Sequence, residues 1–283
     1  MRKTIFAVLA LATAVPLAAQ QSQAPKIVMP RVSPKASLMQ TVGLTDVTIT
    51  YSRPGVKGRE IFGALVPYGK VWRTGANEAT TFEVGDDVTI NGQPLPKGTY
   101  SLHTIPGPDE WTIIFNTVAN QWGSFNYDQS KDQIRVTAKP EKAAFTEMMT
   151  FEVPKVTPDA ATFFIRWADV AVPFTVGTHT AEKVVASARA AVAAAKPDDW
   201  QTPYRAAAAV IDNHLNDAEA KQWLDQSLRI NENLNNLYLK ARMQAAAGDK
   251  AAAIATAREA IAKAGPKDKG EVGEIEHSIA SWQ

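Results

Sequence analysis

The chain has 283 residues, with 30 Lys and Arg against 29 Asp and Glu and no cysteine. At roughly 150 residues per domain, this length favours two domains. The formal net charge of +1 gives no reason to expect nucleic acid or an anionic membrane as a partner. Because cysteine is absent, disulfides, thiolate catalysis and cysteine-ligated metals are excluded, and burial of apolar side chains must hold the fold together.

The first 20 residues have the order of a secretory signal peptide. Two basic residues precede an apolar run from Ile5 to Leu17, and small residues follow. The run is shorter than the roughly 20 apolar residues of a membrane span. We therefore expect cleavage near Ala19 and an exported protein, periplasmic or extracellular, without a membrane span; an uncleaved anchor is the alternative. Residues 21–36, rich in Pro, Gln and Ser, are interpreted as a linker.

Short segments of β-branched and apolar residues dominate residues 37–177. Gly, Pro, Asn and Asp separate these segments, no helical period lies between them, and Asn91-Gly92 is typical of a type I′ hairpin turn. This pattern predicts an antiparallel β-sandwich or jelly-roll-like domain over residues 37–177. The expected strands are 37–42, 47–52, 80–84, 88–90, 99–105, 111–116, 133–138, 148–153 and 162–167, with one more at 173–176.

The composition changes at Ala181, after which Ala, Glu, Lys, Gln and Arg recur at helical spacing. This predicts five or six helices of about 12 to 16 residues over residues 181–283. Tyr204 and Ala220 recur 33 positions later as Leu237 and Ala253, so the region resembles a degenerate tetratricopeptide repeat. An Ala-rich bundle with accidental register is the alternative. The expected fold class is multi-domain β plus α, a sandwich followed by a helical repeat-like domain.

A long segment between the second and third strands, residues 53–79, is rich in Gly, Pro, Arg and Lys and also carries large apolar residues. Ordered loops on rigid β scaffolds are where binding groups tend to lie. Its five basic residues suggest a site for an anion or polar ligand; the alternative is that Arg73 and Glu78 only brace the loop. Trp72 would stack on a ligand ring or serve as a packing anchor. The predicted ligand-binding residues are Arg59, Trp72, Arg73, Thr74, Asn77 and Glu78.

Signals for catalysis and metal binding are weak. There is no phosphate-binding loop, no G-x-S-x-G elbow and no histidine pair at metal-ligand spacing, so no cofactor and no metal site are predicted. His103 lies on an expected strand and would need a positioned partner such as Glu78 or Asp109 to act as a base. A hydrogen-bonded strand histidine is the alternative reading.

Aromatic and amide residues alternate in residues 116–127. This composition suits a carbohydrate platform, because aromatic faces pack on sugar rings while amides reach hydroxyls. A hairpin tip whose aromatic side chains cover the end of a sheet explains the run equally well. The residues concerned are Asn120, Gln121, Trp122, Phe125, Asn126 and Tyr127.

Four runs carry a resemblance to a known family. Gly58-Arg59 with 62–80 (FGALVPYGKVWRTGANEAT), 95–102 (LPKGTYSL), 105–107 (IPG) and 110–116 (EWTIIFN) closely resemble the bacterial family termed domain of unknown function 2911. The resemblance covers about residues 37–176. It implies an exported bacterial protein, often with helical repeats at the C-terminus and without an assigned activity, so no catalytic residue is carried over. The hallmark positions coincide with Arg73, Asn77 and Glu78.

Two functional hypotheses follow. The first is a non-catalytic module of the bacterial cell envelope that binds a polar small molecule, a glycan or a protein segment through the loop from Trp72 to Glu78, while the helices offer a surface to a partner. The second is a hydrolase acting on a polar or glycan substrate, with Glu78 or His103 as general base and Arg73 stabilising an anion. An open cleft shared by Arg73, Glu78 and His103 would favour the hydrolase, and burial of Arg73 and Glu78 in a closed hydrogen-bond network would favour the binding module or a purely structural role.

Overall fold

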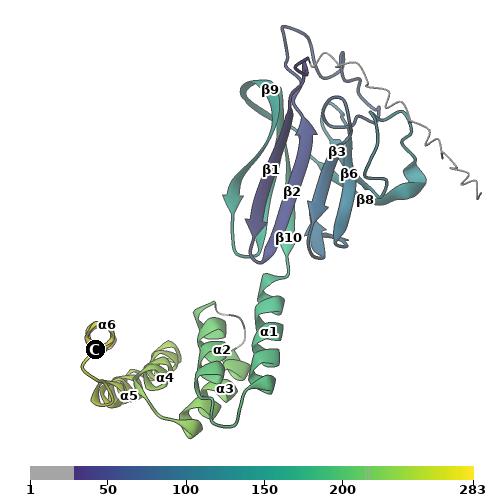
Figure 1. The fold of residues 1–283 in the computed structure, drawn as a ribbon. Coiled ribbons are helices and arrows are strands. Elements are labelled where there is room, and N and C mark those ends of the chain that lie inside the picture. Colours follow the sequence, from purple (N-terminus) through teal and green to yellow (C-terminus); the bar gives the residue numbers. More distant parts are fainter. Residues whose placement is uncertain (1–28, 214, 216) are drawn as a thin grey trace, which may run out of the picture. The chain divides into compact units, whose positions relative to one another are not determined.

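A computed structural model describes residues 29–213, 215 and 217–283 of the chain. The predicted signal peptide and the first half of the predicted linker, residues 21–28, lie outside these residues. The described part consists of an antiparallel β-domain, residues 35–178, followed by six helices (Figure 1). This confirms the predicted fold class. Of the helices described, none is both long and apolar enough to span a bilayer.

The first layer of the β-domain is a six-stranded antiparallel sheet in the order β1-β2-β3-β6-β7-β8. Side chains alternate between its two faces, and the apolar set of each strand faces the second layer. On β2, for example, Val47, Ile49 and Tyr51 are buried, whereas the Thr residues between them face outward. The strands are β1 (Lys35–Val42), β2 (Thr45–Ser52), β3 (Thr80–Val84), β6 (Gly98–Ile105), β7 (Trp111–Asn116) and β8 (Asp132–Ala138).

The second layer is a four-stranded sheet in the order β5-β4-β10-β9, made of β5 (Gln93–Leu95), β4 (Val88–Ile90), β10 (Ala160–Thr178) and β9 (Glu141–Val156). The Asn91-Gly92 turn has the positive φ values expected, 48° and 83°. β5 was not predicted, because its Pro94 argued against a strand. Proline is tolerated there since β5 is an edge strand.

The strands expected at 162–167 and 173–176 form one strand, β10. A bulge at Ala168, with φ of 51°, lets the strand continue past an irregular register with β9. β10 pairs with β9 up to Ala171 and with β4 from Val176 onward. Pro173 falls between these two ladders, where its missing N–H disrupts neither register.

The core of the β-domain lies between the two sheets and extends into the loop of residues 53–79. Ile61, Val66 and Trp72 of this loop are at most 8% exposed and belong to the same apolar cluster as the strands. The loop is therefore packed on the body of the domain, as its apolar residues predicted. Its polar groups must be satisfied locally, because a buried backbone cannot reach water.

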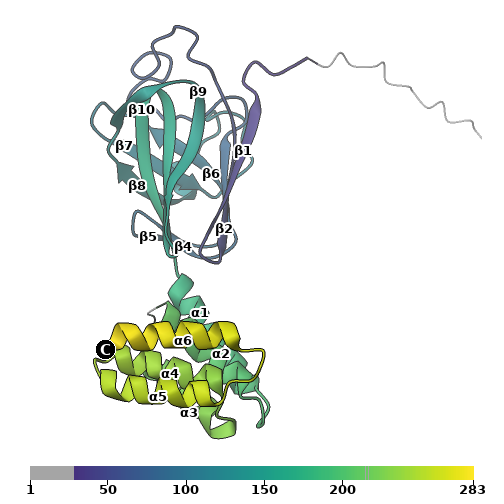
Figure 2. The same cartoon turned by 90° about the vertical axis from the view of Figure 1, so that its left-hand side faces the viewer.

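The helices are α1 (Thr180–Ala194), α2 (Gln201–Asp212), α3 (Asp217–Ile230), α4 (Leu234–Ala246), α5 (Lys250–Ala262) and α6 (Lys269–Trp282). Consecutive helices pack on one another, and Figure 2 shows α4, α5 and α6 lying alongside each other. α2 and α4 begin 33 residues apart, as do α3 and α5. This spacing agrees with the period read from the sequence, and the likeness to a tetratricopeptide repeat remains a prediction.

Candidate functional site

A row of polar side chains crosses the outer face of the six-stranded sheet. The strand registers place Thr50 of β2 opposite Thr81 of β3, and Thr81 opposite Ser101 of β6. Because side chains at paired positions of antiparallel strands point to the same face, the row continues across every strand of the sheet. Its members, here called the polar row, are Ser37, Thr50, Thr81, Ser101, Asn116 and Asp132.

One half of the polar row is covered by the loop of residues 117–128. Gln121 Nε2 lies 3.2 Å from Ser101 Oγ and 3.3 Å from Asn116 Oδ1. Asn116 Nδ2 donates to Asp132 Oδ1 at 2.8 Å, and the Tyr127 hydroxyl donates to Asp132 Oδ2 at 2.6 Å. These hydrogen bonds tie the loop to the sheet and leave only Gln121 Oε1 of these side chains buried without a partner, so this half of the row is structural.

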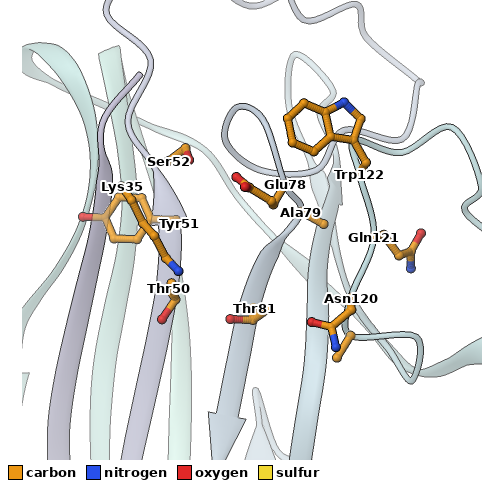
Figure 3. A pocket seen from close by; sticks show the side chains of 11 residues that line it. Lys35, Thr50, Tyr51, Ser52, Glu78, Ala79, Thr81, Asn120, Gln121 and Trp122 are labelled. Carbon is orange, nitrogen blue, oxygen red and sulfur yellow. The ribbon is translucent and has the colours of Figure 1, made fainter. Parts of the chain in front are cut away.

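The other half of the polar row opens into a groove of about 480 Å³. Thr50 and Thr81 contribute to its floor, Lys35 lines it from β1, and Glu78 and Trp122 line it from the two loops (Figure 3). A groove of this volume lies within the roughly 300–1,000 Å³ typical of small-molecule sites. The complete lining is Lys35, Thr50, Tyr51, Ser52, Glu78, Ala79, Thr81, Ala119, Asn120, Gln121 and Trp122.

Backbone pairing fixes the wall of the groove. Glu78 and Trp122 form an antiparallel β-bridge, Ala79 N donates to Gln121 O at 2.9 Å, and Gly123 N donates to Asn77 O at 3.1 Å. The loop of residues 53–79 is thus tied to the loop of residues 117–128 next to the sheet. The groove is therefore formed in advance by hydrogen-bonded backbone, which lowers the entropic cost of binding.

The electrostatics of the groove are balanced. Lys35 contributes one positive charge and Glu78 one negative charge among the residues that line it. No basic residue of the loop of residues 53–79 lines the groove. Arg53 Nε donates to Met149 O at 2.8 Å, and Arg59 Nη2 donates to Gly55 O at 2.6 Å. These guanidinium groups hold backbone carbonyls, so the basic composition of the loop does not create a basic groove.

Residues 33–176 match the family model described as "Protein of unknown function (DUF2911)". The chain belongs to this family. The match covers the β-domain except for the last two residues of β10 and confirms the resemblance read from the sequence. Neither the curated proteins nor the solved structures include a significant match to the chain.

Two predicted ligand-binding residues of the DUF2911 domain lie in its interior. Trp72 is 8% exposed and Thr74 is fully buried. Trp72 Nε1 donates to Gly75 O at 3.1 Å, and Thr74 Oγ1 donates to Thr104 Oγ1 at 3.1 Å. Because their side chains face inward, the structure favours the packing role that the sequence left open for Trp72 and suggests the same role for Thr74, while ligand binding by either stays an untested prediction.

The remaining predicted residues have different surroundings. Arg59 Nε donates to Val56 O at 3.0 Å, and Asn77 Nδ2 donates to Ser33 O at 3.2 Å, so both side chains bind backbone carbonyls. The Arg73 side chain is half-buried, and burial lowers its pKa. Glu78 alone among the six predicted residues lines the groove.

His103 is fully buried beneath the loop of residues 117–128. Its Nδ1 lies 3.4 Å from Ser124 Oγ and its ring is 5.2 Å from that of Tyr127. Burial lowers the pKa of His103 to about 4, Asp132 opposes this shift, and the positive charge of Arg73 adds to it. His103 is therefore neutral at pH 7 and is absent from the groove lining, where Glu78 lies.

Sequence reasoning missed most of the groove. Lys35, Thr50 and Thr81 were not nominated, although outward-facing hydroxyls on neighbouring strands are visible in the alternation of β2 and β3. Asn120, Gln121 and Trp122 belonged to the run considered as a carbohydrate platform. Among the residues described, no three His, Asp or Glu side chains gather closely enough to hold a metal ion.

Proposed function

We propose that the β-domain is a non-catalytic binding module whose groove takes a polar small molecule or glycan. The observation that carries this proposal is the open half of the polar row, which presents Thr50 and Thr81 at the floor of a groove of about 480 Å³. Hydroxyl groups on paired strands have fixed positions, and polar groups at fixed positions give a ligand its orientation. The ligand-binding surface is thus the groove beside Glu78, while the side chains of Trp72 and Thr74 stabilise the loop that forms one wall.

The positions of the ionisable groups favour binding over hydrolysis. General acid–base catalysis requires a base within hydrogen-bond reach of the substrate proton. Glu78 lines the groove, but His103 is buried under the neighbouring loop, and Arg73 does not line the groove. The open cleft shared by all three residues, which the hydrolase hypothesis needs, does not form in the described part of the chain. No observation favours that alternative.

The proposal includes export to the periplasm or beyond the cell. It is supported by the order of basic, apolar and small residues in the first 20 positions. Intact-mass measurement of the protein expressed with its leader in a bacterial host should give a product shortened near Ala19. A full-length mass in the soluble or membrane fraction would contradict export by cleavage.

The helices are proposed to serve a partner rather than the groove. Helix pairs that repeat every 33 residues stack a shared apolar face and leave an extended surface, which repeat proteins use for binding. α4 begins with a complete capping box between Asn233 and Asn236, a feature that fixes where the second pair starts. This part of the proposal rests on the helical spacing alone.

Ligand binding in the groove can be tested with a variant whose side chain fills the groove. Thr81→Phe places a ring over the groove floor while keeping a residue suited to a strand, so ligand binding should be abolished with little loss of stability. Thr99→Phe is the matched control, because Thr99 is an exposed residue of the neighbouring strand β6 outside the groove lining. Binding is measured by thermal shift and ligand-observed NMR against sugars, amino acids, short peptides and nucleotides.

The two variants separate the possible outcomes. A ligand that stabilises the native protein and the Thr99→Phe variant but not the Thr81→Phe variant supports the proposal. A ligand that binds all three equally places the binding surface elsewhere. If no compound of the panel binds the native protein, the function assigned to the groove is rejected.

A further inference from the structure

Trp122 gives the groove an aromatic rim. Its side chain is 61% exposed although its backbone is held by the bridge to Glu78. Figure 3 shows the indole standing at the rim of the groove next to Glu78. A ligand that covers this exposed indole removes apolar surface from water. The arrangement therefore favours a ligand with a flat apolar face.

The floor and side of the groove favour a ligand that also carries polar groups. Thr50 and Thr81 contribute hydroxyl groups and Asn120 contributes an exposed amide. Each of these groups both donates and accepts hydrogen bonds. They suit a ligand whose edge carries several hydroxyls. A pyranose ring combines the two properties, with C–H groups on its face and hydroxyls around its edge.

We propose that the groove binds a neutral saccharide, with one pyranose ring stacked on Trp122 and its hydroxyls directed to Thr81 and Asn120. This inference rests on the proposed function of the groove and specifies its ligand class. Lys35 and Glu78 give the lining one charge of each sign, which suits a ligand without net charge.

Other ligand classes fit the groove less well. A phosphate or nucleotide would need convergent cations, but in the described lining Lys35 stands alone against Glu78. An extended peptide would need an open strand edge, whereas β2, between β1 and β3, is paired on both sides. A purely apolar ligand would leave the hydroxyls of the floor without partners.

The experiment measures binding of neutral oligosaccharides to the purified protein and its variants. The probes are the four-unit oligomers of β-linked glucose, β-linked N-acetylglucosamine and α-linked glucose, titrated calorimetrically. Trp122→Ala should weaken binding on the order of ten-fold, as expected for loss of an aromatic stack. Trp122→Phe should retain most of the affinity. Phe125→Ala is the matched control, because Phe125 is 83% exposed on the same loop and does not line the groove.

The outcomes distinguish this inference from the proposed function. Saccharide binding lost in both Thr81→Phe and Trp122→Ala, and kept in Phe125→Ala, supports both. Saccharide binding that is lost in Thr81→Phe but unchanged in Trp122→Ala overturns the stacking on Trp122, while the proposed function of the groove stands. Binding of amino acids or nucleotides, sensitive to Thr81→Phe, with none of saccharides overturns the ligand class alone. Saccharide binding that survives Thr81→Phe overturns both.

Discussion

Trp72→Ala should lower the free energy of unfolding of the β-domain by about 3–5 kcal/mol, the range for removal of a large buried aromatic side chain. The indole of Trp72 stacks on that of Trp167, with ring centroids 5.7 Å apart and planes at 17°. It meets Trp111 and Phe62 edge-on at 6.4 Å and 6.2 Å. Alanine would leave a cavity among three aromatic rings and free the loop of residues 53–79 from its anchor.

Urea unfolding followed by near-ultraviolet circular dichroism measures this loss. Leu65→Ala is the control on the same loop, where a side chain that is 46% exposed should cost less than about 0.5 kcal/mol. Trp72→Phe gives a folded variant if Trp72→Ala does not fold. It keeps an aromatic ring but loses the hydrogen bond to Gly75 O, with a smaller loss expected. Equal stability of Trp72→Ala and the native protein would show that the loop is not anchored by this residue.

The central strands of the sandwich were predictable because apolar and polar residues alternate along them and turn residues flank them. β3, β4 and β7 have the bounds expected from their alternation and from the turns that flank them. β5 and the continuous β10 were not predictable in the same way. Their proline residues argue against a strand unless the neighbouring strand is known. Only the assembled sheet shows that Pro94 and Pro173 do not interrupt the pairing of β5 or β10 with their neighbours.

The location of the loop as a structural focus was also predictable, but the direction of its side chains was not. Glycine and arginine in residues 53–79 indicated a ligand-facing surface, and large apolar residues indicated packing. The packing is confirmed, since Trp72 lies in the core, while Glu78, six residues later, lines the groove whose ligand is a proposal. Thr74 and Asn77, with φ of 52° and 59°, reverse the chain between them, and one sequence does not reveal such a reversal.

The groove itself depends on strand register, which is a long-range property. Thr50 and Thr81 are 31 positions apart in the chain and become neighbours only because β2 pairs with β3. A shift of one residue in that pairing would turn one of them to the core. The sequence therefore specified the polar residues of each strand without specifying that they form one row.

The buried His103 gives the β-domain a pH-dependent stability. Its pKa is lowered from 6.5 to about 4 by burial, so between these values the unfolded chain binds a proton that the folded chain does not. Stability then rises with pH across this window: it is complete above pH 6.5 and is lost as the pH falls toward 4. A shift of this size corresponds to about 3 kcal/mol. Arg73 acts in the same direction because its charge disfavours a second positive charge nearby.

Urea unfolding at pH 7.5 and pH 4 measures the effect, and His103→Gln isolates it from the carboxylates that also titrate in this range. The native protein should lose about 3 kcal/mol more than His103→Gln between the two pH values. His277→Gln is the control, because His277 is exposed on α6 and should leave the pH dependence unchanged. An equal loss in the native protein and in His103→Gln would mean that the folded domain protonates His103 without penalty. In that case the loop of residues 117–128 does not seal the histidine from water, and the hydrolase hypothesis would regain a base.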